Sequence, residues 1–176
     1  MTGKSRNPLD VYERWTRTEE LFDVASLSVV LRVSATLESR AFRRTYIDTY
    51  VADYGLPAAE RDALQAAADR ETDAFVRVLL TLSGRRHLES NLNGEEAAWK
   101  VWLHGPGGAV VAPEDKERIV NPDPELKKYF PAISPFRQVF RIRFPRLKAW
   151  QGAGTGKLVL TVAGAYGSVD LPWEFP

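Results

Sequence analysis

This chain of 176 residues has no cysteine and only two histidines, His87 and His104. Without cysteine it can form no disulfide, no thiolate nucleophile and no cysteine-ligated zinc or iron–sulfur cluster. Two histidines are too few for a three-histidine metal site, and neither has a histidine or carboxylate partner at helical spacing. We therefore expect no metal site and no cofactor.

Long apolar runs and excess charge are also missing. No apolar stretch approaches the roughly 18 residues that a membrane-spanning helix needs. Twenty-four basic residues oppose 23 acidic ones, which leaves a net charge of +1 and argues against a nucleic-acid-binding domain. With 44% hydrophobic and 27% charged residues, the composition is that of a globular domain and excludes a disordered chain.

The periodicity of the apolar residues predicts the elements. Every odd-numbered position from 27 to 37 is apolar, which predicts a strand over 25–37 with one face in the core. The period then changes to four, with aromatic residues at 42, 46, 50 and 54, and predicts an amphipathic helix over 39–55 that ends at Gly55. A second helix is expected from Pro57 to about residue 72. Strand patterns return at 74–83, 97–104, 109–112, 136–144, 157–163 and 168–171.

These elements predict an α+β fold. The expected body is an antiparallel β-sandwich-like arrangement of six to seven strands, with a two-helix insertion between the first and second strands. No long linker and no internal repeat is visible, so we expect a flexible N-terminal segment at 1–8 and a single domain over 9–176. Asn7 and Pro8 suit the cap and the first turn of a short helix through Trp15.

The sequence contains no complete catalytic motif. The glycine-rich segment 152–157 lacks the first glycine and the final hydroxyl residue of a phosphate-binding loop, and a strand pattern follows it. Neighbouring acidic pairs such as Glu95 and Glu96 are typical of solvated charge, and no serine lies in a nucleophile elbow. We expect no catalytic residues that sequence alone can name.

The least ordinary feature is a row of arginines in the strand predicted at 136–144. Arg137, Arg141 and Arg143 alternate with Phe140, Ile142 and other apolar residues and share one face. Three guanidinium groups on one face make a candidate site for an anion or an acidic partner. The other interpretation is a cross-strand ladder, in which each arginine opposes an acidic residue of a neighbouring strand.

A scattered pattern of aromatic residues and short motifs carries a family resemblance. It comprises Thr36–Ser39, Phe42-Arg43, Tyr46, Trp99, Leu103, Tyr129–Pro131, Phe140–Pro145, Gly164 and Leu171–Trp173. This pattern is similar to uncharacterised envelope lipoproteins of Gram-negative bacteria. The resemblance implies a periplasmic or outer-membrane-tethered domain, and we expect a natural reading frame that continues upstream into an export signal and a lipid-accepting cysteine. It implies no catalytic residue.

The function expected from the sequence is therefore a non-catalytic cell-envelope domain. It would bind an unknown protein or an anionic envelope component, or support an envelope assembly, and would meet a membrane only through an upstream lipid anchor. The alternative is an enzyme whose site is made of polar residues dispersed along the chain. A deep pocket with a carboxylate of perturbed pKa favours the enzyme, and a flat arginine–aromatic patch favours the binding domain.

Overall fold

The computed structural model describes residues 7–150 and 156–174. Within these residues the helices are α1 (Pro8–Trp15), α2 (Arg40–Tyr54), α3 (Ala58–Ala74) and α4 (Pro124–Tyr129). The strands are β1 (Thr16–Asp23), β2 (Ser28–Leu37), β3 (Phe75–Gly84), β4 (Trp99–His104), β5 (Val110–Val111), β6 (Asp115–Ile119), β7 (Gln138–Pro145), β8 (Lys157–Gly164) and β9 (Gly167–Glu174). Short 3-10 turns lie at His87–Glu89, Pro106–Gly108 and Lys148–Trp150.

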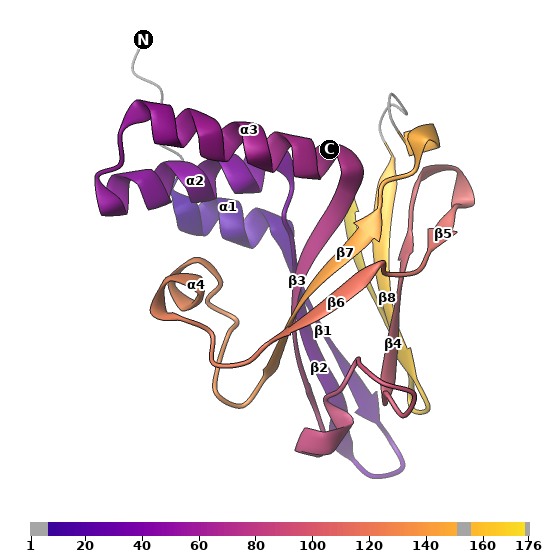
Figure 1. The fold of residues 1–176 in the computed structure, drawn as a ribbon. Helices are drawn as coiled ribbons and strands as arrows, with labels where there is room; N and C mark the ends of the chain where they lie inside the picture. The colour runs from indigo at the N-terminus through magenta and orange to yellow at the C-terminus, as the bar shows by residue number, and fades with distance from the viewer. Residues whose placement is uncertain (1–6, 151–155, 175–176) are drawn as a thin grey trace.

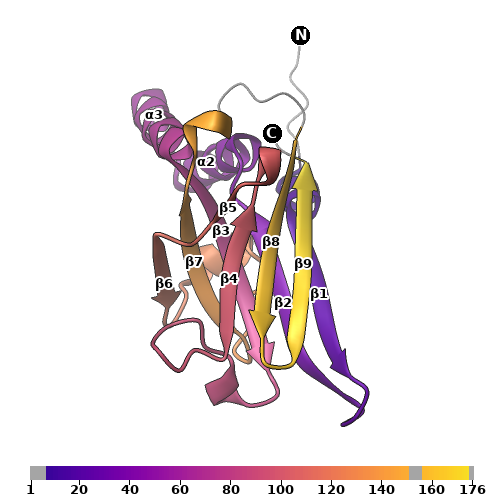
Figure 2. The ribbon, with the colours of Figure 1, turned by 90° about the vertical axis from the view of Figure 1, so that its right-hand side faces the viewer.

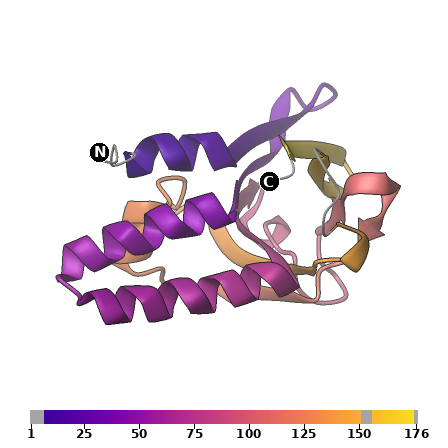
Figure 3. The ribbon, with the colours of Figure 1, turned by 90° about the horizontal axis from the view of Figure 1, so that it is seen from above.

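The strands form two antiparallel sheets, which confirms the predicted α+β class. The five-stranded sheet has the order β1-β2-β3-β7-β6, and the four-stranded sheet has the order β5-β4-β8-β9. Helices α1, α2 and α3 lie together at one end of the five-stranded sheet, and α4 lies below them on the same side (Figure 1). Seen from above, the helices flank one side of the strands (Figure 3).

The two sheets share one hydrophobic core. Alternate residues of β3 and β7 are fully buried, and alternate residues of β4, β8 and β9 are buried opposite them. Trp99 and Trp173 from the four-stranded sheet and Trp150 after β7 are among the largest fully buried side chains. Strand alternation therefore determines which residues enter this core.

Along one side the sheets meet at β1 and β9, which run beside each other (Figure 2). Arg17 Nε of β1 donates a hydrogen bond to the Pro172 carbonyl of β9 at 2.9 Å, and Trp173 Nε1 of β9 donates to the carbonyl of Trp15, the last residue of α1, at 2.8 Å. Strand β9 is thus held against both β1 and the end of α1.

Helix α2 begins and ends where the sequence predicts. Ser39 caps it by accepting a hydrogen bond from the Phe42 amide, and Gly55 ends it in the left-handed conformation at φ 63°. Of the predicted aromatic seam only Phe42 is fully buried, and Tyr46 and Tyr50 are half-buried. Phe42 is buried against Phe130, with ring centroids 5.4 Å apart, whereas Tyr54 is exposed.

The structure differs from the prediction in strand number and position. It has nine strands among the described residues instead of six to seven, because β1 and β6 were not expected. The helical pair therefore lies between β2 and β3, the second and third strands, rather than between the first and second. Both missed strands are sheet edges with mixed charged sequences, which leave no clean apolar alternation to detect.

Three apolar residues that were predicted on core faces of strands are exposed in the structure. Leu27 and Val29, predicted on the core face of the strand at 25–37, are exposed because Leu27 belongs to the turn before β2 and Val29 lies near that end. Phe136 also lies outside its strand and is exposed. Most of the glycine-rich segment 152–157 and most of the predicted N-terminal segment lie outside the described residues, while Asn7 and Pro8 begin α1 as predicted.

The burial of Phe42 predicts a large loss of stability when its ring is removed. We expect Phe42→Ala to lower the free energy of unfolding by about 3 kcal/mol, because it leaves a cavity against Phe130. Arg44→Ala, on the exposed side of the same helix, should cost less than about 0.5 kcal/mol. Denaturant titration of both variants measures the difference, and equal costs would contradict the assigned packing.

Candidate functional site

The three arginines proposed as an anion site do not converge. Arg143 Nη2 lies 3.3 Å from Asp115 Oδ2, on the neighbouring strand β6, as in a cross-strand pair. Arg137 Nη1 donates to Ser34 Oγ at 3.2 Å. Arg141 alone lines a sizeable cavity beneath the helical pair. The structure therefore separates the predicted row into three environments.

That cavity, of about 340 Å³, lies between α2, α3 and the five-stranded sheet. One wall is apolar and includes Ile47, Leu64 and Phe130. The floor is charged and consists of Glu38, Arg43, Glu71, Arg77 and Arg141. A pocket of this size with an apolar wall and a few charged groups is the usual form of a small-molecule site.

Two helix–strand junctions position the floor. Strand β2 ends at Leu37, and Glu38 follows immediately before the α2 cap. Helix α3 runs without a loop into β3, so Arg77 comes three residues after the helix. The Glu38 amide donates to the Arg77 carbonyl at 2.9 Å, which brings both junctions side by side.

The charged side chains form a connected network. Arg77 Nη2 lies 2.7 Å from Glu38 Oε2, and Arg77 Nη1 lies 2.6 Å from Glu71 Oε2. Arg43 Nη2 also contacts Glu71 Oε2, at 2.7 Å, and Arg43 Nη1 donates to the Ala68 carbonyl at 3.0 Å. Three guanidinium groups, with Arg141 included, face two carboxylates, so the floor retains one positive charge.

The ion pairs favour the charged forms of Glu71 and Arg77. Burial acts to raise the pKa of Glu71, but the positive charges of Arg77 and Arg43 outweigh it and bring that pKa below its ordinary value. For Arg77, burial acts to lower the pKa, and the attraction of Glu38 and Glu71 raises it overall. A carboxylate held ionised in this way is a poor general acid at neutral pH.

Arg141 has the fewest hydrogen bonds of the three arginines at the cavity floor. Its Nε lies 3.5 Å from Glu38 Oε1, and within the described part of the chain neither atom has a hydrogen-bond partner. The Arg141 side chain is 28% exposed, whereas Glu38 is almost fully buried. Nε is buried and faces Glu38, so the donors available to a bound anion are the two Nη groups, which make no hydrogen bond to the described residues.

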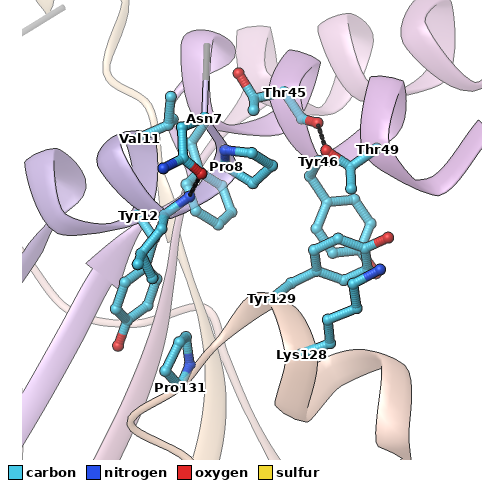
Figure 4. Close-up of a pocket in the computed structure, with 12 residues that line it drawn as sticks. Asn7, Pro8, Val11, Tyr12, Thr45, Tyr46, Thr49, Lys128, Tyr129 and Pro131 are labelled. Carbon is cyan, nitrogen blue, oxygen red and sulfur yellow. Dashed lines mark hydrogen bonds between the residues drawn. The ribbon is translucent and has the colours of Figure 1, made fainter. Parts of the chain in front are cut away.

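A second, smaller hollow of about 190 Å³ lies on the other side of α2, among α1, α2 and α4 (Figure 4). Its tyrosine hydroxyls are occupied: Tyr46 donates to Glu125 at 2.8 Å, Tyr129 donates to Asp53 at 2.6 Å, and Tyr12 accepts from the Ala132 amide. Burial raises the pKa of Tyr46 and of Tyr129, and the acidic partners raise both further. This hollow offers apolar surface but no unsatisfied charge.

Sequence reasoning found one residue of the charged cavity and missed four. Glu38, Arg43, Glu71 and Arg77 come from separate elements, and no spacing along the chain connects them. The one available signal was the charged residue Arg77 between the apolar residues Val76 and Val78 of a predicted strand. Only the fold reveals that its partners are Glu38 and Glu71.

Comparison with known proteins finds no matching family model, no related curated protein and no similar solved structure. Among the helices of residues 7–150 and 156–174, none is long and apolar enough to cross a membrane. The site itself therefore carries the functional argument.

The network predicts an acid-sensitive fold. Because the pKa of Glu71 is lowered by folding, its stabilising contribution is fully present above its unfolded value of about 4.5 and is lost as the pH falls through the lower folded value. We expect Glu71→Gln to lower the melting temperature at about pH 7 and to reduce its further decrease at about pH 3.

Thermal denaturation at the two pH values measures this effect. Glu60→Gln is the matched control, because Glu60 is an exposed carboxylate of the same helix. An unchanged acid dependence in Glu71→Gln would show that the carboxylate contributes nothing to the fold.

Proposed function

We propose that this protein is a binding domain that holds a small amphipathic anion in the charged cavity beneath α2 and α3. The supporting observation is Arg141, a guanidinium group with available donors at the floor of a cavity whose wall is apolar. A carboxylate head would meet Arg141, and an aliphatic body would lie against Ile47, Leu64 and Phe130.

Two features favour binding over catalysis. The carboxylates of the floor are paired with arginines, and the pKa of Glu71 is lowered rather than raised toward neutrality. The remaining positive charge matches a ligand with one negative charge, as electrostatic complementarity requires.

We also propose that the protein resides in the cell envelope, either in the periplasm or tethered to the outer membrane. The supporting observation is the sequence pattern, which is similar to that of envelope lipoproteins. Cells that express the native reading frame should show the protein in the periplasmic or membrane fraction. Recovery of all the protein in the cytosolic fraction would contradict the location and leave the ligand proposal standing.

Octanoate tests the ligand proposal directly. We expect octanoate to bind in isothermal titration calorimetry and to raise the melting temperature, because it joins a single carboxylate to an aliphatic chain. Octanol and octyltrimethylammonium have the same chain length without the negative charge, and they should bind at least about tenfold more weakly.

Variants locate the binding. Arg141→Gln should weaken octanoate binding by about tenfold or more, the value of a lost hydrogen bond to a charged group. Arg143→Gln is the matched control, because Arg143 lies on the same strand and face but pairs with Asp115 outside the cavity. Equal binding of octanol, or equal losses in both variants, would overturn the proposal.

A further inference from the structure

The turn between β1 and β2 presents an apolar tip. Phe22 is 52% exposed, Val24 75%, Leu27 76% and Val29 37%. Phe22 and Val29 face each other across the hairpin, and the other two lie in the turn itself. These four residues, which we call the hairpin tip, lie at the end of the molecule opposite α1, α2 and α3 (Figure 1).

The hairpin tip projects beyond the sheet. The last residue pair between β2 and β3 is Leu31 with Gly84, so the hairpin continues past the end of its neighbour. Arg85, just after β3, braces the projection by donating to Ser28 Oγ at 2.8 Å and to Ser26 Oγ, and it lies 3.6 Å from Asp23 Oδ2. The tip is therefore a held structure rather than a loose loop.

Both the backbone conformation and the exposure of Leu27 are unusual for a leucine. Its backbone has φ 51°, in the left-handed region, and the only other such non-glycine residue among those described is Asn121. Asparagine tolerates that conformation, whereas leucine has a steric cost there. Leucine also exposes most of its apolar side chain to water. A strained and exposed apolar residue indicates a role in contact with something apolar.

We propose that the hairpin tip inserts into the apolar boundary of a lipid bilayer. A specific protein interface buries about 800 Å² on each partner, which four side chains on a narrow convex tip do not supply. Hydrocarbon needs no complementary shape, and binding to it increases with the apolar area inserted.

The charges near the tip indicate an uncharged membrane surface. Arg32 pairs with Glu20, and Arg85 contacts Asp23. Arg86 is exposed, and its amide donates to Glu89 Oε2, so an acidic side chain lies beside it as well. Acidic groups therefore offset the arginines near the tip. Asp23 also accepts hydrogen bonds from Ser26 Oγ and the Ala25 amide. The hydrogen bond from Ser26 is the main reason why the pKa of Asp23 is lowered. Binding should therefore occur on zwitterionic vesicles and change little with salt.

The absence of cysteine allows a site-specific test. Val24→Cys, labelled with a nitrobenzoxadiazole fluorophore, should show brighter and blue-shifted emission when phosphatidylcholine vesicles are added. Val110→Cys is the matched control, because Val110 is an exposed valine on β5, an edge strand of the four-stranded sheet that lies away from the hairpin tip (Figure 1). Its emission should not change.

A second variant separates insertion from folding. Leu27→Asn should reduce co-sedimentation of the unlabelled protein with phosphatidylcholine vesicles by about tenfold, because it removes a leucine side chain from the inserted area. Its melting temperature should be equal or higher, because asparagine relieves the strain at φ 51°.

Four results would overturn the proposal. They are no emission change at residue 24, the same change at residue 110, binding only to anionic vesicles with loss in high salt, and burial of the tip in a lipid-free dimer.

Discussion

The buried contact between Glu38 and Arg77 is the constraint on which the helical end of the molecule depends. It joins the point where β2 gives way to α2 with the point where α3 gives way to β3, through one backbone hydrogen bond and one ion pair. A buried carboxylate is tolerated only when it is paired, since an isolated buried charge is very costly. The pair therefore determines where the helical hairpin leaves the sheet and where it returns.

The rest of the site follows from that constraint. Helix α3 buries only Ala68 and Thr72, so it contributes little apolar packing of its own. It is held instead by polar contacts, above all those of Arg43 and Arg77 with Glu71. Small side chains and polar contacts leave space beneath the helices, and that space is the charged cavity. Arg141 borders it with only a distant contact to Glu38.

The two ends of the molecule differ in how they treat charge and apolar surface. At the helical end, charges are enclosed and neutralise one another incompletely, which suits the capture of an anion. At the other end, the charges around the β1–β2 hairpin pair locally and apolar side chains project into solvent. The shared core of the two sheets separates these ends, so the proposed anion site and the proposed membrane contact would involve different residues.

The sequence by itself determined the elements whose patterns are local. Ser39 and Gly55 mark the ends of α2 because capping depends on neighbouring backbone groups, and the apolar alternation of β3 and β8 identifies their core faces because strand geometry is periodic. Edge strands β1 and β6 were not predicted because their sequences are mostly charged or polar and no residue of either strand is fully buried, which leaves no periodic apolar signal.

Only the tertiary structure decided the site and the hairpin tip. Arg141 was in the predicted row, yet its environment depends on Glu38, which lies about a hundred positions earlier in the chain. Likewise, the alternation that places Leu27 with the core residues continues past the point where β3 ends, so an apolar pattern that predicts burial becomes an exposed tip. Periodicity specifies which face a side chain occupies, but contacts between distant segments decide what covers that face.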